Sequence, residues 1–160
     1  MKKLLSFAAV LSAVLLLAFS CSEPDPVRDA MEAYAKANID NPDSYKFNYM
    51  GIEKEYTYFN DLAQYMQGLE KLKAQAKDKA PYEAELEKAH ELVKELGTQV
   101  ACREYSLYFW CMGGQSGTLK LERVVLARYD ADGKLMAMTM DPGSLPTYPA
   151  LQMLKDQGRL

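Results

Sequence analysis

Three cysteines and one histidine are the residues of this chain that most often take part in covalent or metal chemistry. A cysteine becomes a catalytic nucleophile when a histidine lies beside it and a third group orients that histidine. His90 lies within a helical pattern, and no spacing places it beside Cys102 or Cys111. We therefore interpret His90 as a surface histidine, and we predict no catalytic residue, no metal site and no cofactor.

Cys102 and Cys111 are nine residues apart in a segment rich in β-branched and aromatic residues. On one straight strand an odd separation points two side chains to opposite faces, and nine residues span about 30 Å. Because bridged cysteines need Cα atoms within about 7 Å, a disulfide would require a break in the strand. We expect two buried free thiols, and a broken strand is the alternative that the oxidising surroundings of an exported protein leave open.

Two loops have compositions that are found in ligand-binding loops. Residues 130–133 read Asp-Ala-Asp-Gly, but the Lys-Leu-Met that follows lacks the further ligands of a calcium loop. Residues 113–117 read Gly-Gly-Gln-Ser-Gly, without the Gly-Lys-Ser/Thr that completes a phosphate loop. The first pattern predicts a hairpin turn and the second a plain turn.

Aromatic residues are the most distinctive chemical feature, because the chain has 11 tyrosines, 5 phenylalanines and one tryptophan. Aromatic rings with a polar tip serve both glycan and protein contacts. The candidate ligand or partner surface consists of five of them: Tyr56, Tyr58, Tyr105, Tyr108 and Trp110. The alternative is that these rings fill the core between the sheet and its helices.

The N-terminus has the features of a secretory signal peptide, which we assign to residues 1–20. Lys2 and Lys3 give a positive start, and an apolar run from Leu4 to Phe19 follows. This run is short for a membrane span, which needs about 20 residues. The sequence therefore predicts export.

Residues 17–21, Leu-Ala-Phe-Ser-Cys, resemble a bacterial lipobox. The resemblance implies that Cys21 is the lipidation site, with palmitate-type acyl chains on its thiol and on the new amino terminus. Several acyl chains give stable anchoring, whereas one chain binds a membrane only marginally. We expect residues 21–26 to be a lipidated tether and the protein to be a lipoprotein of the cell envelope, on the periplasmic or surface face of a bacterial membrane.

Composition limits the remaining function classes. The chain has 160 residues, 49% hydrophobic and 26% charged, which is typical of a single globular domain. Loss of Lys2 and Lys3 with the signal peptide lowers the basic residues from 19 to 17, against 22 acidic ones, for a net charge of −5. We expect no nucleic-acid partner, because such proteins usually carry a basic excess.

The elements are predicted from periodicity. Asp25-Pro26 is a helix start, and the apolar spacing that follows predicts a short helix that ends before Asp40. Alternation predicts a strand with Tyr45, Phe47 and Tyr49 on one face and a bulge at Gly51. Apolar stripes predict two helices within 60–97, most simply a hairpin with its loop before Pro81 and a left-handed cap at Gly97. One long helix kinked at Pro81 is the alternative.

Three strands follow, over 99–112, 118–129 and 135–140, and a final helical turn is expected over 148–155. The first of these strands is dense in apolar residues, which predicts a central strand covered on both faces. The fold class is therefore α+β: an N-terminal helix, one strand, a helical hairpin and a three-strand antiparallel meander, with helices packed on one face of the sheet. We expect one domain over residues 27–156 and a tail over 157–160.

A resemblance to a family supports this organisation. Residues 41–45, Asn-Pro-Asp-Ser-Tyr, the aromatic strand 105–110, Gly113-Gly114, the strand 119–129 and the Asp130–Gly133 turn occur in this order in uncharacterised small Bacteroidetes-type lipoproteins, which this chain resembles. Relatives often carry Arg-Ala-Lys-Asn before the glycines, where this chain has Phe-Trp-Cys-Met over 109–112. The resemblance implies a compact envelope domain and brings no activity or site with it.

Physical reasoning gives residues 41–45 a structural role. Pro42 excludes a helical conformation at Asn41, the Asp43 and Ser44 side chains can bond nearby backbone N–H groups, and Tyr45 would anchor the strand in the core. Together these patterns favour a lipid-anchored, non-enzymatic interaction or assembly domain with an envelope protein as partner. The alternative is a small-ligand or glycan-binding module that uses the aromatic sheet face.

Overall fold

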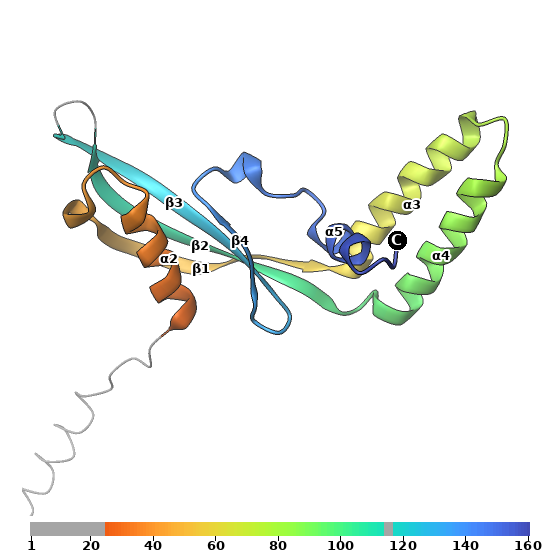
Figure 1. Cartoon of the computed structure of the whole chain (residues 1–160), viewed down its shortest axis with the longest axis horizontal. Coiled ribbons are helices and arrows are strands. Elements are labelled where there is room, and N and C mark those ends of the chain that lie inside the picture. Colours follow the sequence, from red (N-terminus) through yellow and green to blue (C-terminus); the bar gives the residue numbers. More distant parts are fainter. Residues whose placement is uncertain (1–24, 114–116) are drawn as a thin grey trace, which may run out of the picture.

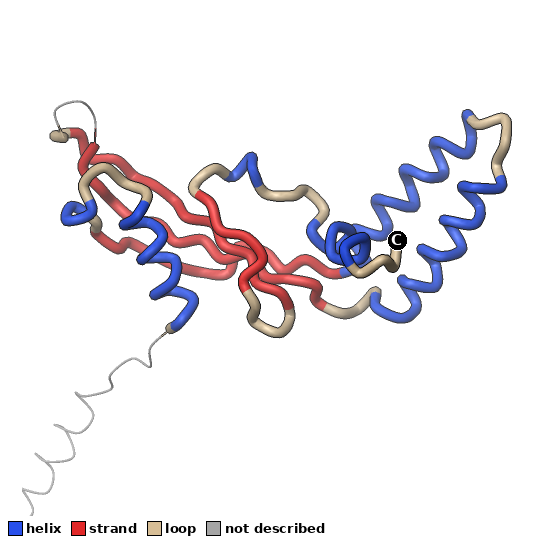
Figure 2. The backbone as a smooth tube through the Cα atoms, viewed as in Figure 1, coloured by secondary structure: helices blue, strands red, loops and turns tan. Residues whose placement is uncertain are grey.

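The computed structural model describes residues 25–113 and 117–160 and has an α+β fold, in which helices pack against a four-stranded antiparallel sheet of order β1-β2-β3-β4 (Figure 1, Figure 2). The elements are α2 (Pro26–Ala37), η1 (Pro42–Ser44), β1 (Lys46–Thr57), α3 (Tyr58–Gln75), α4 (Ala80–Leu96), β2 (Val100–Gly113), β3 (Leu119–Asp130), β4 (Leu135–Thr139), η2 (Pro142–Ser144) and α5 (Pro149–Asp156). The predicted fold class is confirmed, including the hairpin and the meander that ends in an edge strand.

Helix α2 begins where the sequence predicts it and covers one face of the sheet. The Asp25 carboxylate accepts hydrogen bonds from the backbone N–H groups of Val27 and Arg28, at 3.0 and 3.2 Å. Its buried residues pack in a first core, which we call the sheet core: Met31, Ala35, Leu107, Phe109, Cys111, Val125, Ala127 and Tyr129. Because strand residues alternate between faces, odd-numbered residues of the middle of β2 and β3 point to α2, and we call this side the α2 face.

Bulges in β1 change which side chains share a face. Phe47 pairs with Phe109, but Tyr49 pairs with Tyr108, so one residue is inserted at Asn48. Phe47 therefore lies on the α2 face and Tyr49 on the opposite face. The prediction that the aromatic residues of this strand share one face is wrong, and the bulge predicted at Gly51 lies elsewhere, since that glycine pairs with Ser106.

The segment between α2 and β1 is held by its serine. The Ser44 hydroxyl donates to the carbonyl of Asn41 at 2.6 Å and accepts from the backbone N–H of Met112 at 2.9 Å. The Tyr45 ring packs 5.1 Å from the Phe109 ring, centroid to centroid. These contacts support the structural role predicted for Ser44 and Tyr45, but the N–H that Ser44 accepts belongs to a distant strand residue, whereas the prediction was a nearby one.

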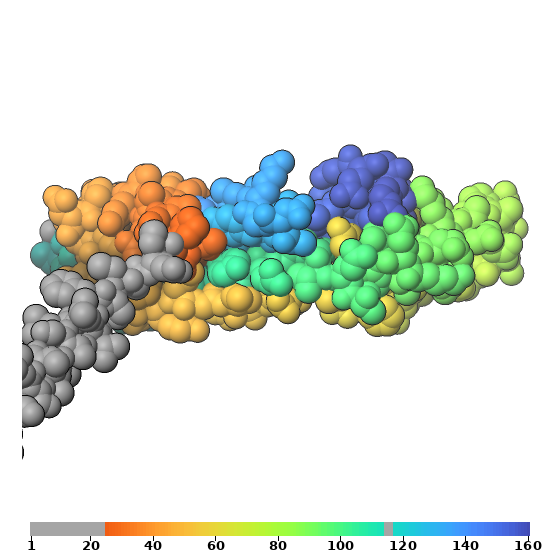
Figure 3. All heavy atoms as spheres, turned by 90° about the horizontal axis from the view of Figure 1, so that it is seen from below, coloured from red at the N-terminus to blue at the C-terminus, as the bar shows by residue number. Residues whose placement is uncertain are grey.

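A second core, the helical core, lies beyond the sheet. The hairpin α3–α4 extends past the end of the sheet, and α5 packs beside it (Figure 1, Figure 3). The buried residues of this core are Tyr58, Leu62, Ala89, Leu92, Leu96, Ala101, Ala150, Leu151 and Leu154. No residue belongs to both cores.

The hairpin loop is confirmed, but the predicted cap at its end is wrong. Gly97 has φ −52°, a right-handed conformation, and its N–H bonds to the Val93 carbonyl at 2.9 Å. A Cβ at this position would lie 2.5 Å from that same carbonyl oxygen. A glycine is therefore needed here because the backbone approaches closely, and not because the chain makes a left-handed turn.

The Asp130–Gly133 segment forms the predicted hairpin turn. The Asp130 carboxylate accepts from the N–H groups of Asp132 and Lys134, at 3.0 and 2.8 Å, and Gly133 has φ +81°. Of the predicted turn over 113–117, residues 114–116 lie outside the described ranges. After α5, the Arg159 guanidinium lies 2.6 Å from the Glu95 carboxylate, and Leu160 packs against the helical core, so the predicted tail contacts the domain.

Candidate functional site

Three aromatic side chains lie together on the face of the sheet opposite α2. Tyr49 and Tyr108 are partners across β1 and β2, with ring centroids 6.3 Å apart and planes at 29°. Trp110 is two residues further along β2 and so points the same way. Tyr49 is 56% exposed and the other two are half-buried. We call Tyr49, Tyr108 and Trp110 the aromatic shelf.

The shelf exists because of the β1 bulge and a glycine. The bulge at Asn48 turns Tyr49 to this side. A Cβ at Gly51 would collide with the Tyr49 hydroxyl, so the ring lies over bare backbone. The central strand β2 is therefore covered by α2 on one face only along this stretch, which corrects the prediction that both of its faces are covered.

Polar groups border the shelf. The Glu53 carboxylate accepts hydrogen bonds from the Ser106 hydroxyl at 2.6 Å and the Tyr108 hydroxyl at 3.2 Å. Its negative charge raises the pKa of Tyr108, which keeps that hydroxyl protonated. Lys120 places its ammonium 4.2 Å from the Trp110 ring centroid. The shelf therefore combines exposed rings with fixed charges.

The other three predicted surface aromatics lie elsewhere. Tyr56 is 7% exposed, and its hydroxyl bonds to Glu104 and Arg128. Tyr58 is buried in the helical core. Tyr105 lies on the α2 face, edge-on to Tyr129 at 5.7 Å. The structure brings together Tyr108 and Trp110 of the predicted set and adds Tyr49, which the expected alternation had assigned to the other face.

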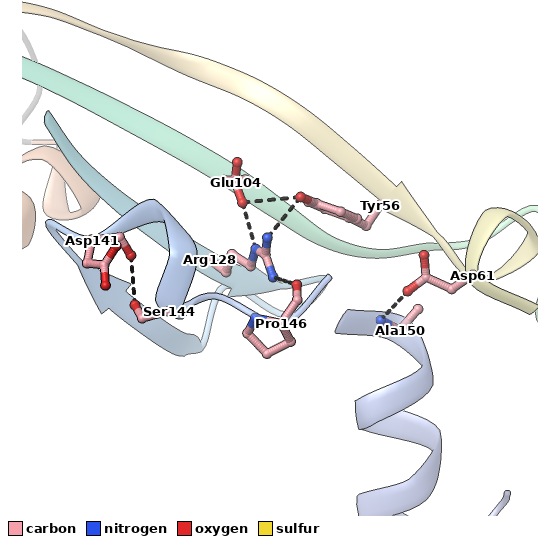
Figure 4. A network of polar contacts seen from close by, with 8 residues as sticks. All are labelled: Tyr56, Asp61, Glu104, Arg128, Asp141, Ser144, Pro146 and Ala150. Carbon is pink, nitrogen blue, oxygen red and sulfur yellow. Dashed lines mark hydrogen bonds and ion pairs between the residues drawn. The ribbon is translucent and has the colours of Figure 1, made fainter. Parts of the chain in front are cut away.

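A buried polar network joins the sheet to the segment before α5 (Figure 4). Arg128 is 5% exposed, and its Nε lies 2.7 Å from the Glu104 carboxylate. Its Nη2 donates to the Tyr56 hydroxyl at 2.9 Å, and its Nη1 donates to the Pro146 carbonyl. The guanidinium is thus occupied by protein acceptors from three other segments, which gives it a structural role.

A hollow of about 450 Å³ lies next to this network, between β3–β4 and α5. Apolar side chains such as Met136, Met153 and Pro149 line it together with Arg128 and Asp130. Of the four charged residues that line the hollow, Arg128 and Asp130 already serve the polar network and the β3–β4 turn, and the other two are Lys134 and Asp156. The hollow is therefore an apolar recess in which neither Arg128 nor Asp130 is free to bind a ligand.

The thiols of Cys102 and Cys111 are buried, whereas the histidine is exposed. Both cysteines are free and buried, as predicted, and burial is the main cause that raises the pKa of Cys102 to about 11. A thiol with a raised pKa is a poor nucleophile. His90 is exposed on α4, on the hairpin. Within residues 25–113 and 117–160 no group of three or more potential His, Cys, Asp or Glu ligands is positioned to hold a metal ion.

Cys21 and the signal peptide lie outside the described residues. Among the helices of the described part of the chain, none combines the length and the apolar character that a membrane crossing requires. A scan against models of known protein families gives no match, and neither the curated proteins nor the solved structures contain a significant match to the chain.

Proposed function

We propose that this chain is a bacterial envelope protein, anchored by lipid on Cys21, whose domain is a non-enzymatic interaction module. The observation that carries the proposal is the aromatic shelf, which α2 leaves uncovered. Tyrosine and tryptophan are enriched among the residues that dominate protein–protein binding energy, because large rigid rings bury much surface at low entropic cost. The envelope location itself is supported by the sequence of residues 1–21.

A partner protein fits the shelf through both its rings and its rim. Tyr49 offers an exposed ring stacked on Tyr108, and Trp110, next along the same face of β2, lies against the Lys120 ammonium. Glu53 fixes the Tyr108 hydroxyl, so this part of the surface is pre-organised before binding. We propose that a partner buries the rings at the centre of the interface and leaves Glu53 and Lys120 at its rim.

Site-specific photocrosslinking in the native envelope tests the proposal. A photoreactive residue replaces Tyr49 in the full-length lipidated chain, and a matched control replaces Leu72 of α3, which is 52% exposed. We expect one discrete protein adduct from position 49, weakened at least fivefold by Trp110→Ala, and none from position 72. Equal adducts from both positions, or no protein adduct from position 49, would refute a partner at the shelf.

Glycan binding is a second candidate, because carboxylate and amide groups lie near the rings. The Asn48 amide lies 3.5 Å from the Glu122 carboxylate, and Glu122 is on the strand next to Trp110. Rings that stack on sugar faces beside such acceptors are typical of glycan sites. Saturable binding of an envelope glycan by the purified domain, abolished by Trp110→Ala, would favour this function over a protein partner.

Anchoring has its own test. We expect mass spectrometry of the protein from its host to find an acylated Cys21 as the first residue, and Cys21→Ala to release the chain from the membrane fraction. An intact leader with an unmodified cysteine would remove the anchor from the proposal.

A further inference from the structure

We propose that the α2 face of the sheet is turned toward the lipid bilayer, with Ile52 and Phe47 at the headgroup boundary, so that the aromatic shelf points away from the membrane. This inference rests on the lipid anchor proposed for Cys21. It assigns a membrane-contacting surface to the domain and an orientation to the partner site.

The chain between the proposed lipid site and the fold is short. Four peptide steps separate Cys21 from Asp25, and they span at most about 14 Å. Asp25 is already fixed, because its carboxylate caps α2. The start of α2 must therefore stay close to the membrane surface, whereas the far end of the hairpin α3–α4 is free to stand away from it (Figure 1).

The start of α2 lies close to the edge strand β1. Val27, in the first turn of α2, packs against the sheet core, to which Tyr129 belongs, so the start of the helix lies on the α2 face. Tyr129 contacts Tyr105, and Tyr105 is paired with Ile52 of β1. Strands are about 4.8 Å apart, so β1 lies about 10 Å from β3, a distance that the tether can cover.

Exposed apolar side chains of β1 lie on this side of the sheet. Ile52 is 55% exposed and Phe47 is 39% exposed, and both pair with β2 residues that point to the α2 face. Helix α2 covers β2 and β3, so Ile52 of the edge strand remains open beside it, and Phe47 is covered only in part, by Arg28. Because interfacial binding strength scales with the apolar area buried, these side chains would add to the attachment that the lipid anchor provides.

The charges near these residues suit a neutral lipid surface. The Arg28 guanidinium lies 4.0 Å from the Phe47 ring centroid, a pairing that suits the phosphate level of a bilayer. Glu32 lies 2.8 Å from Arg28 and 3.7 Å from Lys36, and Asp29 adds a negative charge. With Asp25, this side carries three carboxylates against the two cations Arg28 and Lys36, so zwitterionic headgroups fit it better than anionic ones.

Tyrosine and tryptophan also favour membrane interfaces, so the aromatic shelf is the competing surface. It lies on the opposite side of the sheet from α2 and therefore from the start of the tether. Tyr49 and Ile52 lie on the same strand and are almost equally exposed, at 56% and 55%. They point to opposite faces of the sheet, so only one of them can face the bilayer.

Tryptophan quenching by brominated lipid distinguishes the two sides. Trp110 is the only tryptophan, so Trp110→Phe gives a silent background. Ile52→Trp and Tyr49→Trp are placed in this background as matched variants of the full-length lipidated chain, in vesicles of acyl-brominated phosphatidylcholine. Vesicles without bromine give the reference emission, and circular dichroism checks that both variants keep the fold of the parent.

We expect at least twofold stronger quenching for Ile52→Trp than for Tyr49→Trp, with Trp110 of the unaltered chain as weakly quenched as Tyr49→Trp. Equal quenching, stronger quenching at position 49, or no quenching at either position overturns the inference. Flotation of the protein with the vesicles separates this outcome from failure of the anchor: a chain that does not float refutes both proposals, whereas a floating chain with the wrong quenching pattern refutes only the orientation.

Discussion

At the scale of single residues, the most consequential group is Arg128. It is 5% exposed and bonds to Glu104, Tyr56 and Pro146. Removal of the guanidinium would leave the Glu104 carboxylate without its cation in a poorly hydrated place, and breaking a buried pair in this way costs about 3–5 kcal/mol. We expect Arg128→Ala to lower the free energy of unfolding by about that amount, measured by urea denaturation.

Two further variants make that measurement specific. Arg123 is an exposed arginine on the same strand, and Arg123→Ala should change stability by less than about 0.5 kcal/mol. Joint replacement with Glu104→Gln should recover part of the loss, because no uncompensated charge then remains buried. A loss below about 1 kcal/mol for Arg128→Ala would show that water reaches this pair.

Asp61 is a second residue whose environment has a measurable consequence. Its carboxylate is 4% exposed and accepts the backbone N–H of Ala150 at 2.8 Å, which caps α5 from α3 (Figure 4). Burial raises the pKa of Asp61 against the lowering effect of its backbone hydrogen bonds. The folded state therefore holds this proton more tightly than the unfolded state does, for which the pKa is about 3.9.

The raised folded-state pKa of Asp61 sets the direction in which folding stability changes with pH. As pH rises from about 3.9 through the higher folded pKa of Asp61, the wild type loses stability relative to Asp61→Asn, because only the wild type then carries a buried charge. Urea denaturation of both proteins across this range measures the difference. Asp78→Asn is the control, since Asp78 also accepts a helix N–H, from Ala80 at 3.1 Å, but is exposed. A difference between wild type and Asp61→Asn that is flat with pH would contradict the raised pKa.

At the scale of elements, two similar turns make a matched pair. Each of η1 and η2 has a proline first and a serine third. Ser44 also accepts the N–H of Met112, at the end of β2, whereas the Ser144 bonds stay within residues 139–144. We expect Ser44→Ala to cost about 1–3 kcal/mol, because it leaves a half-buried N–H unpaired, and Ser144→Ala about 0.5 kcal/mol. Thermal unfolding checks the order, and equal losses would mean that the Met112 bond contributes nothing.

The sequence predicts the helices well but does not predict the irregularities of the sheet. Period and cap residues predict α2 and the hairpin, because amphipathic spacing and the Asp25 cap act locally. The bulge at Asn48 is set by pairing between β1 and β2, some 60 residues apart, and no local pattern reveals it. That single inserted residue moves Tyr49 onto the shelf. The Arg128 network was missed for the same reason, since its partners meet only once the register is fixed.

At the scale of the whole molecule, the two hydrophobic cores are joined by a strand that continues directly into a helix. Strand β1 runs into α3 without a loop, and the junction is held by hydrogen bonds from Tyr58 N–H to the Gln99 carbonyl and from Phe59 N–H to the Gly97 carbonyl, at 3.2 and 3.1 Å. The sheet core lies under α2, close to the proposed anchor, and the helical core lies beyond the sheet. This arrangement predicts that the two parts open separately.

Hydrogen exchange tests that prediction with two matched variants. Leu62 and Leu107 are both fully buried, one in each core, and each Leu→Ala change costs about 2–5 kcal/mol. Because opening events in proteins are local as well as global, we expect Leu62→Ala to speed exchange at least tenfold in α3, α4 and α5 but little in α2. Leu107→Ala should do the reverse. Uniform acceleration of exchange by both variants would mean that the two cores unfold as one cooperative unit. The junction at Tyr58 would then couple the unfolding of one core to that of the other.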